Sequence, residues 1–457
     1  MTDVDVVVIG AGVVGCAVAR ALGGYDISVA LVDARNDVGD ATSKANTALL
    51  HTGFDAVPGS LESSLISQGY SMLADYAREV GIPVEYTGAI LVAWTQEERD
   101  TLPSLRDKAI KNGYHACALL TADEVYAAIP DLGPGALAGL SVPDEAIICP
   151  WTTTLAYATQ AHARGVQIHL ATRVESVSVT AAGTTVHTTR GDIATTWVIN
   201  AAGMGADVID RWFGFNRFTV VPRRGQLLVF DKSARSMAPC IVLPVPSSKG
   251  KGVLVSPTIF GNVMLGPTAE DLDDRTDTST TQEGFAFLVD KGRRIMPTLL
   301  EEEVTASYAG LRASTEHSDY VVDIDPVQHY VLLGGIRSTG LSASMALAEH
   351  IVGLLRESGF DLTARTDVPP PPRMPNIGEA FTRPYQDDDL IRRDPDFGRI
   401  VCFCERATVG EVRDALGGPL PARDVDGLRR RTRAMMGRCQ GFYCGAEVEA
   451  LLDRSST

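Results

Sequence analysis

Four cysteines close to the C-terminal end have the residue type and the spacing to bind metal. Cys402 and Cys404 form a C-x-C pair, Cys439 and Cys444 form a C-x4-C pair, and 34 residues separate the two pairs. Structural zinc is usually held by C-x2-C or C-x4-C pairs, so the C-x-C pair is unusual for zinc. Four thiolates also satisfy a 2Fe–2S cluster, with two sulfurs on each iron. We therefore predict a 2Fe–2S cluster, with zinc and an empty redox dithiol as the alternatives.

Two short helices are expected to position these cysteines. Thr408 and Glu411 have the spacing of a capping box, which predicts a helix that begins there. A second helix is predicted through residues 425–436, ending at Gly437 just before Cys439. Its arginines either offset negative charge on the cluster or form a solvated helix face with one docking contact, and both readings stay open. These arginines are Arg429, Arg430, Arg431 and Arg433.

The N-terminal segment carries the pattern of a dinucleotide-binding unit. An apolar, β-branched run precedes Gly10, Gly12 and Gly15, which have G-x-G-x-x-G spacing, and a helix-compatible segment follows. The first glycine permits a tight turn, the second lets the backbone approach a pyrophosphate, and the third allows close helix packing. The next predicted strand ends in Asp33, roughly 20 residues downstream, where a ribose-binding acid is expected. Together these features predict a Rossmann-type dinucleotide site.

Three later segments indicate that the dinucleotide is FAD. They are "ATSKANTALLHTG" from residue 41, "WVINAAGMGAD" from residue 197 and "YVLLGGIRSTGLSASMALAEHIVGLL" from residue 330. They resemble, in order and content, the D-amino-acid-oxidase-like flavoprotein superfamily, whose last motif is a glycine-rich turn that opens a helix under the flavin. The N-terminus of such a helix would stabilise negative charge on the reduced flavin. The resemblance implies further cofactor-binding residues, namely Thr42, Ser43, Asn46, Thr47, Val174, Ala202, Gly203, Gly335, Gly340, Leu341 and Ser342.

Three side chains outside the glycine motifs are candidates for chemistry on a substrate. His51 ends the flavin-contacting segment, and a neutral imidazole titrates in the range useful for accepting a proton. Packing against the flavin ring is its alternative role. Arg312 and Arg337 lie where related enzymes line the substrate pocket, which implies an anionic substrate, a carboxylate or a phosphate. Structural ion pairs are the alternative for both, and Arg224 is a weaker third candidate.

The cysteine segment extends the resemblance to a family of dehydrogenases. "VCFCERATVGEVRDAL" and "GRCQGFYC" are similar to the 2Fe–2S domain related to bacterioferritin-associated ferredoxin. The order of all the motifs resembles the A subunits of anaerobic glycerol-3-phosphate dehydrogenases, while the turn "GGIRSTGLSAS" looks more like the branch that contains L-2-hydroxyglutarate oxidase. The resemblance implies an FAD-dependent dehydrogenase that oxidises the secondary alcohol of a small anion. That anion would be a glycerol 3-phosphate-like polyol phosphate or a 2-hydroxy acid.

The cluster implies how the electrons leave such an enzyme. They would pass from the flavin to the 2Fe–2S cluster and then to an electron-acceptor protein or a quinone-linked partner. Two other functions stay open: an amine or amino-acid dehydrogenase of the same superfamily, and a non-catalytic electron-transfer subunit.

The expected fold is α/β, with a Rossmann-type FAD domain interleaved with a substrate domain built on a mixed or antiparallel sheet. Period-two alternation, as in "FTVVPRRGQLLVFD", predicts that sheet. Four consecutive prolines predict a stiff spacer before a small helical iron–sulfur module. The predicted bounds are 1–80, 150–205 and 305–365 for the FAD domain, 81–149 and 206–304 for the substrate domain, 366–398 for the linker and 399–457 for the 2Fe–2S domain.

Composition and charge exclude several classes of protein. The chain has 45% hydrophobic and 21% charged residues, as soluble globular proteins do. Its 41 basic and 57 acidic residues give a net charge of −16, which argues against nucleic-acid binding and against adhesion to anionic lipid by charge alone. A strand begins almost at Met1, and no apolar run approaches the roughly 20 residues of a membrane span. We expect a cytoplasmic protein, associated with membranes only through a partner, with reduced thiols at Cys16, Cys117, Cys149 and Cys240.

Overall fold

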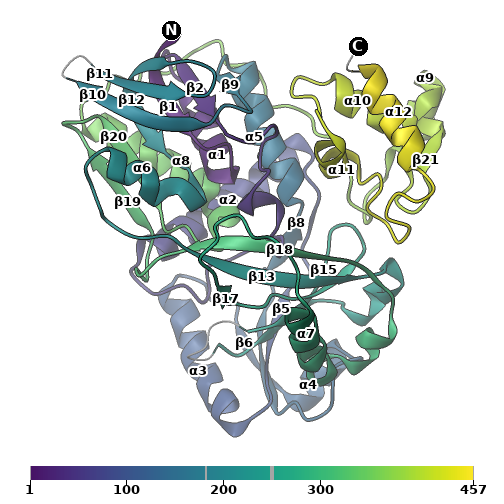
Figure 1. Cartoon of the computed structure of the whole chain (residues 1–457). Helices are drawn as coiled ribbons and strands as arrows, with labels where there is room; N and C mark the ends of the chain where they lie inside the picture. Colours follow the sequence, from purple (N-terminus) through teal and green to yellow (C-terminus); the bar gives the residue numbers. More distant parts are fainter. Residues whose placement is uncertain (1, 181–182, 247–251, 456–457) are drawn as a thin grey trace.

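The fold has two large sheet regions and a C-terminal module beside the first of them (Figure 1). The computed structural model describes residues 2–180, 183–246 and 252–455. Among these residues, no helix is long and apolar enough to cross a membrane.

The first large sheet, here the Rossmann-type sheet, is built around parallel strands. Strand β1 (Thr2–Ile9) pairs in parallel with β2 (Val29–Val32) on one side and with β12 (Ile193–Asn200) on the other. These strands are runs of Val, Ile and Leu because both faces of a parallel sheet are covered. The sheet is completed by β9 (Gln167–His169), β10 (Val174–Thr180), β11 (Gly183–Thr188), β20 (Tyr330–Gly334) and β19 (Val321–Asp325).

Helices pack on the Rossmann-type sheet and on one another. Helix α1 (Val13–Leu22) follows the glycine turn directly and lies against α5 and α8. Its buried face is made of small residues, which permits close approach of its neighbours. The other helices here are α2 (Leu61–Val80), α5 (Pro150–Ala163), α6 (Ala206–Trp212) and α8 (Gly340–Glu357).

The second large sheet, here the mixed sheet, is mostly antiparallel, as the alternating patterns predict. Strand β13 (Val221–Phe230) pairs antiparallel with β16 (Val263–Gly266) and with β18 (Val304–Ser314), while β14 (Ile241–Pro244) and β5 (Ala89–Ala93) run parallel. The remaining elements are β15 (Leu254–Pro257), β17 (Glu270–Asp271), β7 (Ala138–Val142), β6 (Ala118–Thr121), α3 (Gln96–Lys111), α4 (Ala122–Ala128) and α7 (Gln282–Ile295).

Strand β18 differs from its expected place. Residues 305–314 were expected to begin the last FAD-domain segment, but β18 is paired along its whole length with β13 of the mixed sheet. The reason is the long backbone pairing itself, which runs from Val221 opposite Ser314 to Phe230 opposite Val304 and joins the two strands into one ribbon. A small third sheet consists of β3 (Leu49–Leu50), β8 (Ala146–Ile148) and β4 (Val84–Glu85).

The C-terminal module is small, largely helical and has its own apolar core. Its elements are β21 (Ile400–Cys402), β22 (Ala407–Thr408), α10 (Val409–Gly417), α11 (Val425–Thr432) and α12 (Gly445–Ser455). The predicted capping box is present, since Thr408 and Glu411 exchange both hydrogen bonds at the start of α10. The predicted second helix is shorter than expected. It ends at Thr432 because Arg433 adopts a left-handed backbone conformation with φ of 67°.

Residues 366–398 were expected to be a stiff spacer rather than a packed element. The proline-containing part has no regular structure, but the segment is anchored at several points and contains α9 (Asp388–Arg393). Met374 donates its N–H to Val80, Glu379 donates its N–H to Ile259, and the Arg383 side chain is almost completely buried. The segment therefore fastens the C-terminal module to the rest of the protein.

Candidate functional site

The glycine turn after β1 forms a cradle that has no room for side chains. Gly10 has φ of 107°, and a Cβ atom there would lie 2.5 Å from the Ala201 carbonyl oxygen. A Cβ atom on Gly15 would lie 1.8 Å from the Gly10 carbonyl oxygen. Gly12 is the N-cap residue of α1. The backbone is thus bare where a pyrophosphate would lie against the helix N-terminus.

Asp33 lies at the end of β2 and is tied to this cradle. Its carboxylate accepts a hydrogen bond from the Ala11 N–H at 2.6 Å and another from the Arg35 N–H at 2.7 Å. Burial raises the pKa of Asp33, although both backbone donors act in the opposite direction. A buried acid in this position fits the ribose of a dinucleotide.

The expected flavin-contacting segment lies between α1 and β18. The Ser43 hydroxyl accepts the Val13 N–H at 2.9 Å, so it closes the start of α1. Thr42 donates its hydroxyl to the Leu311 carbonyl, and the Tyr308 hydroxyl donates to the Asn46 carbonyl, at 2.9 and 2.8 Å. The structure therefore brings the segment against β18 of the mixed sheet.

The N-terminus of α8 is the second support of this segment. The His51 N–H donates to the Ser342 hydroxyl at 2.8 Å, and Ser342 lies in the first turn of α8. Among the other predicted cofactor residues, Thr47 lies just before β3, Val174 starts β10, and Ala202 and Gly203 follow β12. Gly335, Gly340 and Leu341 frame the turn between β20 and α8.

The His51 side chain is held by a buried acid. Its Nδ1 atom lies 3.0 Å from Oε2 of Glu145, a carboxylate with no exposed surface. The other carboxylate oxygen accepts hydrogen bonds from the N–H and the hydroxyl of Thr52, both at 2.8 Å. The Glu145 carboxylate therefore lies beside Nδ1, where it can orient the imidazole ring.

Arg312 is a half-buried cation whose charge is not matched. It extends from β18 over Gly225, whose missing side chain leaves room for the guanidinium. Within the part of the chain that the structure describes, its guanidinium makes no ion pair or hydrogen bond with another residue. Burial lowers the pKa of Arg312, and the nearby charge of Arg223 lowers it further. Such a group favours an anionic ligand.

The other two arginines are already paired. Arg337 forms an ion pair with Glu62, whose second oxygen accepts the Thr339 hydroxyl at 2.7 Å. Arg224 forms ion pairs with Glu270 and Asp277, at 2.8 and 2.7 Å. The alternative role in structural ion pairs therefore applies to Arg337 and Arg224. Arg312 forms no such ion pair among the described residues.

The four C-terminal cysteines come together in the folded module. Cys402 and Cys444 are in side-chain contact, as are Cys404 and Cys439, so the thiols form two neighbouring pairs. Among the described residues, no cluster of three or more His, Cys, Asp or Glu side chains is arranged to hold a single metal ion. Two thiol pairs match the ligand set of a 2Fe–2S cluster, which takes two sulfurs per iron.

Backbone donors surround one of these thiols. Hydrogen bonds from the backbone of Tyr443, together with those from Gly441 and Phe442, lower the pKa of the Cys439 thiol. Donors of this kind favour the thiolate that binds iron and tune the potential of a bound cluster.

The arginines of α11 join the C-terminal module to the loop after β2 of the Rossmann-type sheet. Arg430 and Arg431 contact Asp37 at 2.6 and 2.7 Å, and Arg430 also contacts Asp40 at 2.8 Å. Burial alone would raise the pKa of Asp37, but the two arginines hold it below its usual value. Arg430 and Arg431 therefore make the docking contact that the second reading allowed, but they are buried in it rather than solvated.

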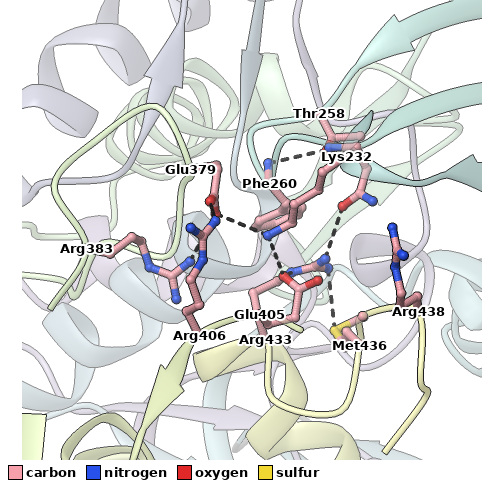
Figure 2. Close-up of polar contacts among 12 residues, drawn as sticks. Lys232, Thr258, Phe260, Glu379, Arg383, Glu405, Arg406, Arg433, Met436 and Arg438 are labelled. Carbon is pink, nitrogen blue, oxygen red and sulfur yellow. Dashed lines mark hydrogen bonds and ion pairs between the residues drawn. The ribbon is translucent and has the colours of Figure 1, made fainter. Parts of the chain in front are cut away.

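A second group of ion pairs lies nearer the cysteines (Figure 2). Arg433 donates from Nε to Glu405 at 3.2 Å, and Lys232 of the mixed-sheet region contacts the same carboxylate at 3.2 Å. Lys232 also contacts Glu379, which pairs with Arg406. Because Glu405 directly follows Cys404, this network fixes the cysteine loop against the rest of the protein.

Aromatic side chains connect the network to the flavin-contacting segment. The Arg433 guanidinium lies 4.3 Å from the centre of the Phe260 ring, which stacks on Trp151 at 4.9 Å. The Trp151 indole N–H donates to the Lys44 carbonyl at 2.9 Å. Residues 42–47 and the cysteine module are thus linked by continuous side-chain packing.

Sequence reasoning missed Glu145, Asp37 and Trp151. Glu145 is 94 positions from His51, and the only signal for it is an acidic pair, Asp144 and Glu145, before an apolar strand. Asp37 and Trp151 lie outside any spacing motif, so only the fold reveals their partners. Cys16, Cys117 and Cys149 are free buried thiols, and Cys240 is a partly buried one.

Comparison with known proteins identifies both parts of the chain. Residues 5–354 match the family described as FAD dependent oxidoreductase, and residues 400–454 match the BFD-like [2Fe-2S] binding domain. A glycerol 3-phosphate dehydrogenase of Caloramator mitchellensis is 36% identical over 453 residues, covering 98% of this chain and 94% of that protein. A glycerol 3-phosphate oxidase of Mycoplasma pneumoniae is 31% identical, covering 77% of this chain and 94% of that protein.

A solved structure shows the same fold with its cofactor. The reduced L-α-glycerophosphate oxidase of Mycoplasma pneumoniae with FAD bound superposes with a TM-score of 0.77 at 29% identity, covering 82% of this chain and 100% of that one. These findings confirm FAD and the 2Fe–2S cluster as the cofactors, and they confirm the predicted α/β fold class. The chain therefore belongs to the FAD-dependent oxidoreductases and carries a C-terminal BFD-like 2Fe–2S-binding domain.

Proposed function

We propose that the protein is a dehydrogenase that oxidises the secondary alcohol of a small anion, with glycerol 3-phosphate as the first candidate. The observation that carries this proposal is the combination of a histidine beside a buried acid and a half-buried arginine without a charge partner. His51 and Glu145 supply a proton acceptor, and Arg312 supplies a binding group for phosphate or carboxylate.

The substrate assignment is supported by the relatives. The glycerol 3-phosphate dehydrogenase of Caloramator mitchellensis matches along nearly the whole chain, including the cysteine module. An L-2-hydroxyglutarate dehydrogenase of Indibacter alkaliphilus is 27% identical and covers 63% of this chain, so a 2-hydroxy acid is the second candidate. Both substrates join a secondary hydroxyl to an anionic group.

The chemistry divides between the cofactor and the protein. Bound FAD supplies the acceptor for the hydride that leaves the carbinol carbon. The His51 imidazole would accept the hydroxyl proton as the hydride leaves, so the C–H and O–H bonds break and a carbonyl forms. Glu145 stabilises the imidazolium through Nδ1 and keeps the ring in position. Arg312 holds the anionic end and so orients the alcohol.

The C-terminal module would take the electrons onward one at a time. We propose Cys402, Cys404, Cys439 and Cys444 as the ligands of the cluster and the packed side chains between Lys44 and Arg433 as the contact that joins the two halves. An external acceptor, a protein or a quinone-linked partner, would complete the reaction.

The test is anaerobic reduction of the bound flavin by a panel of compounds. sn-Glycerol 3-phosphate, L-2-hydroxyglutarate, glycerol and several amino acids are mixed with the purified protein, and the flavin absorbance is followed. We expect glycerol 3-phosphate to bleach the flavin and glycerol, which lacks the anion, to do so far more slowly. Bleaching by an amino acid alone would replace the proposal with an amine dehydrogenase, and no bleaching by any of them would favour an electron-transfer subunit.

A further inference from the structure

Three aromatic side chains beside the cysteines lie open to solvent. Phe403, Phe442 and Tyr443 are 75%, 83% and 80% exposed. Phe403 lies between Cys402 and Cys404, and the other two lie between Cys439 and Cys444. Single exposed apolar residues are ordinary, but adjacent exposed aromatic rings mark a surface that another molecule covers.

The cysteine contacts bring the three rings to one place. Since Cys402 meets Cys444 and Cys404 meets Cys439, the two loops that carry the rings lie against each other. The rings of Phe442 and Tyr443 are 5.1 Å apart in an edge-to-face arrangement. We call Phe403, Phe442 and Tyr443 the aromatic rim.

Backbone hydrogen bonds hold the loop that carries Phe442 and Tyr443 in place. Phe442 donates its N–H to the Cys439 carbonyl at 2.9 Å, and Gly445 donates its N–H to Gly441 at 2.7 Å. In the extended C-x-C segment, alternation sends the Cys402 side chain into the core and that of Phe403 outward. A rigid aromatic surface loses little conformational entropy on binding.

The charge next to the aromatic rim is negative. Helix α12 begins directly after Cys444 and exposes Glu447, Glu449 and Asp453 against one arginine, Arg454. The nearby Arg438 is half-exposed, but it already pairs with Asp231 and lies near Glu303.

We propose that the aromatic rim is the docking surface for a one-electron carrier protein with a basic rim around its own redox centre. A second copy of this chain would bring the same acidic helix and a net charge of −16 against an acidic surface, so a basic partner complements it and a copy does not. The inference rests on the proposed function in one respect, since it takes the cluster as the point from which electrons leave. Any protein seated on the rim lies directly over the four cysteines.

The transfer itself moves one electron and no atom. One electron leaves the reduced protein, and the metal centre of the carrier is reduced by one unit. No proton or leaving group takes part. The surface therefore has to supply proximity and orientation only, which suits a small, transient interface with an aromatic centre.

Ferric cytochrome c, a basic one-electron carrier with an exposed haem edge, is the probe. The holoenzyme is reduced anaerobically with dithionite, so the experiment does not depend on the organic substrate, and is then mixed with cytochrome c. The test protein is Phe442→Ser/Tyr443→Ser, and the matched control is Val327→Ser, which alters an apolar side chain 89% exposed in the turn between β19 and β20. Ferricyanide serves as a small acceptor that needs no docking.

We expect the double variant to reduce cytochrome c roughly tenfold more slowly or worse, and Val327→Ser to match the wild type. The ferricyanide rate, the iron content and the visible spectrum should be unchanged. Raising the salt from about 10 mM to about 150 mM should slow the wild-type reaction. Replacing Glu447 and Glu449 by lysine should slow it at low salt and invert that dependence.

Several results would overturn the docking role. Equal cytochrome c rates for wild type and double variant would do so, and a parallel fall with ferricyanide would place the effect in the cluster instead. Loss of a dimer in sedimentation of the double variant would assign the surface to a second copy. Failure of the substrate panel alongside a tenfold docking effect would reject the proposed reaction and leave the docking surface standing.

Discussion

Arg312, Arg337 and Arg224 have the same side chain in three different electrostatic settings. Arg224 and Arg337 each lie against carboxylates that offset their charge. Arg312 is half-buried without such a partner among the described residues, and another cation, Arg223, lies nearby. Of these three arginines, Arg312 is therefore the one suited to bind an anion.

Replacing Arg312 by Gln should weaken binding of the anionic substrate. A hydrogen-bonded charge is worth about 1.5–3 kcal/mol, so KM should rise roughly 10- to 100-fold, while Arg312→Lys should recover part of the loss. Steady-state kinetics on purified protein with full FAD content measure this. Arg337→Gln is the comparison and should leave KM within about threefold. A larger effect at Arg337 than at Arg312 would move the anion site to the turn before α8.

His51→Ala should slow flavin bleaching by roughly 10²–10⁴-fold, because the hydroxyl proton loses its acceptor. Stopped-flow absorbance under anaerobic conditions measures the rate. FAD content and the unfolding midpoint should stay at wild-type values. An unchanged rate would remove His51 from the chemistry.

Glu145→Gln should lower kcat and leave KM close to its wild-type value, because Glu145 acts on the imidazole and not on the substrate. The loss of a hydrogen bond to a charged group predicts a fall of roughly 10- to 100-fold. If KM rises and kcat does not fall, Glu145 holds the pocket together rather than the histidine.

At the scale of elements, local sequence patterns predicted the turns, helix caps and strands that form within one segment of the chain. The glycine turn, the cap of α10 and the alternation of β13 were all readable because each depends on neighbours in sequence. The pairing of β18 with β13 and the Asp37 ion pairs join segments that are far apart in the sequence. No periodicity encodes such contacts, so the site could be predicted only as separate parts.

Gly15→Ala should prevent stable binding of FAD. The added Cβ would lie 1.8 Å from the Gly10 carbonyl oxygen, so α1 and the turn would have to separate. Flavin absorbance per mole of protein measures the loss. Gly353→Ala is the matched control in α8, where nothing lies within 4 Å of the added atom, and it should stabilise the protein by about 0.5–1 kcal/mol. Normal flavin content in Gly15→Ala would contradict the cradle.

Asp37→Asn should destabilise the contact between α11 and the first domain by about 3 kcal/mol, because two buried arginines lose their main partner. The pKa of Asp37 is depressed in the folded protein, so its contribution is complete above its unfolded pKa of about 3.9 and is lost as the pH falls through the folded value. The stability difference between wild type and variant should therefore be constant above about pH 4 and shrink below it. Thermal unfolding across that range measures it, and a difference that grows on acidification would contradict this sign.

At the scale of the whole molecule, the proposed function assigns oxidation of the substrate and export of electrons to separate domains. Cys439→Ser should lose iron and the visible absorbance of the cluster, yet glycerol 3-phosphate should still bleach the flavin at the wild-type rate. Reduction of cytochrome c should fall at least about tenfold. Iron analysis and the two spectroscopic rates test this together, and a loss of flavin bleaching would show that the domains are not separable.

The loop after β2 contacts both the nucleotide cradle and helix α11. Its first residue, Asp33, accepts a hydrogen bond from the Ala11 N–H of the nucleotide cradle. Asp37 and Asp40, a few positions later, form ion pairs with Arg430 of α11. One short stretch of chain therefore takes part in two equilibria, retention of the nucleotide and closure of the C-terminal module, and linkage makes each favour the other. We expect loss of the flavin to weaken the contact between the C-terminal module and the rest of the protein. A protein without FAD, which cannot oxidise substrate, would then also hold its cluster less firmly in place for a partner.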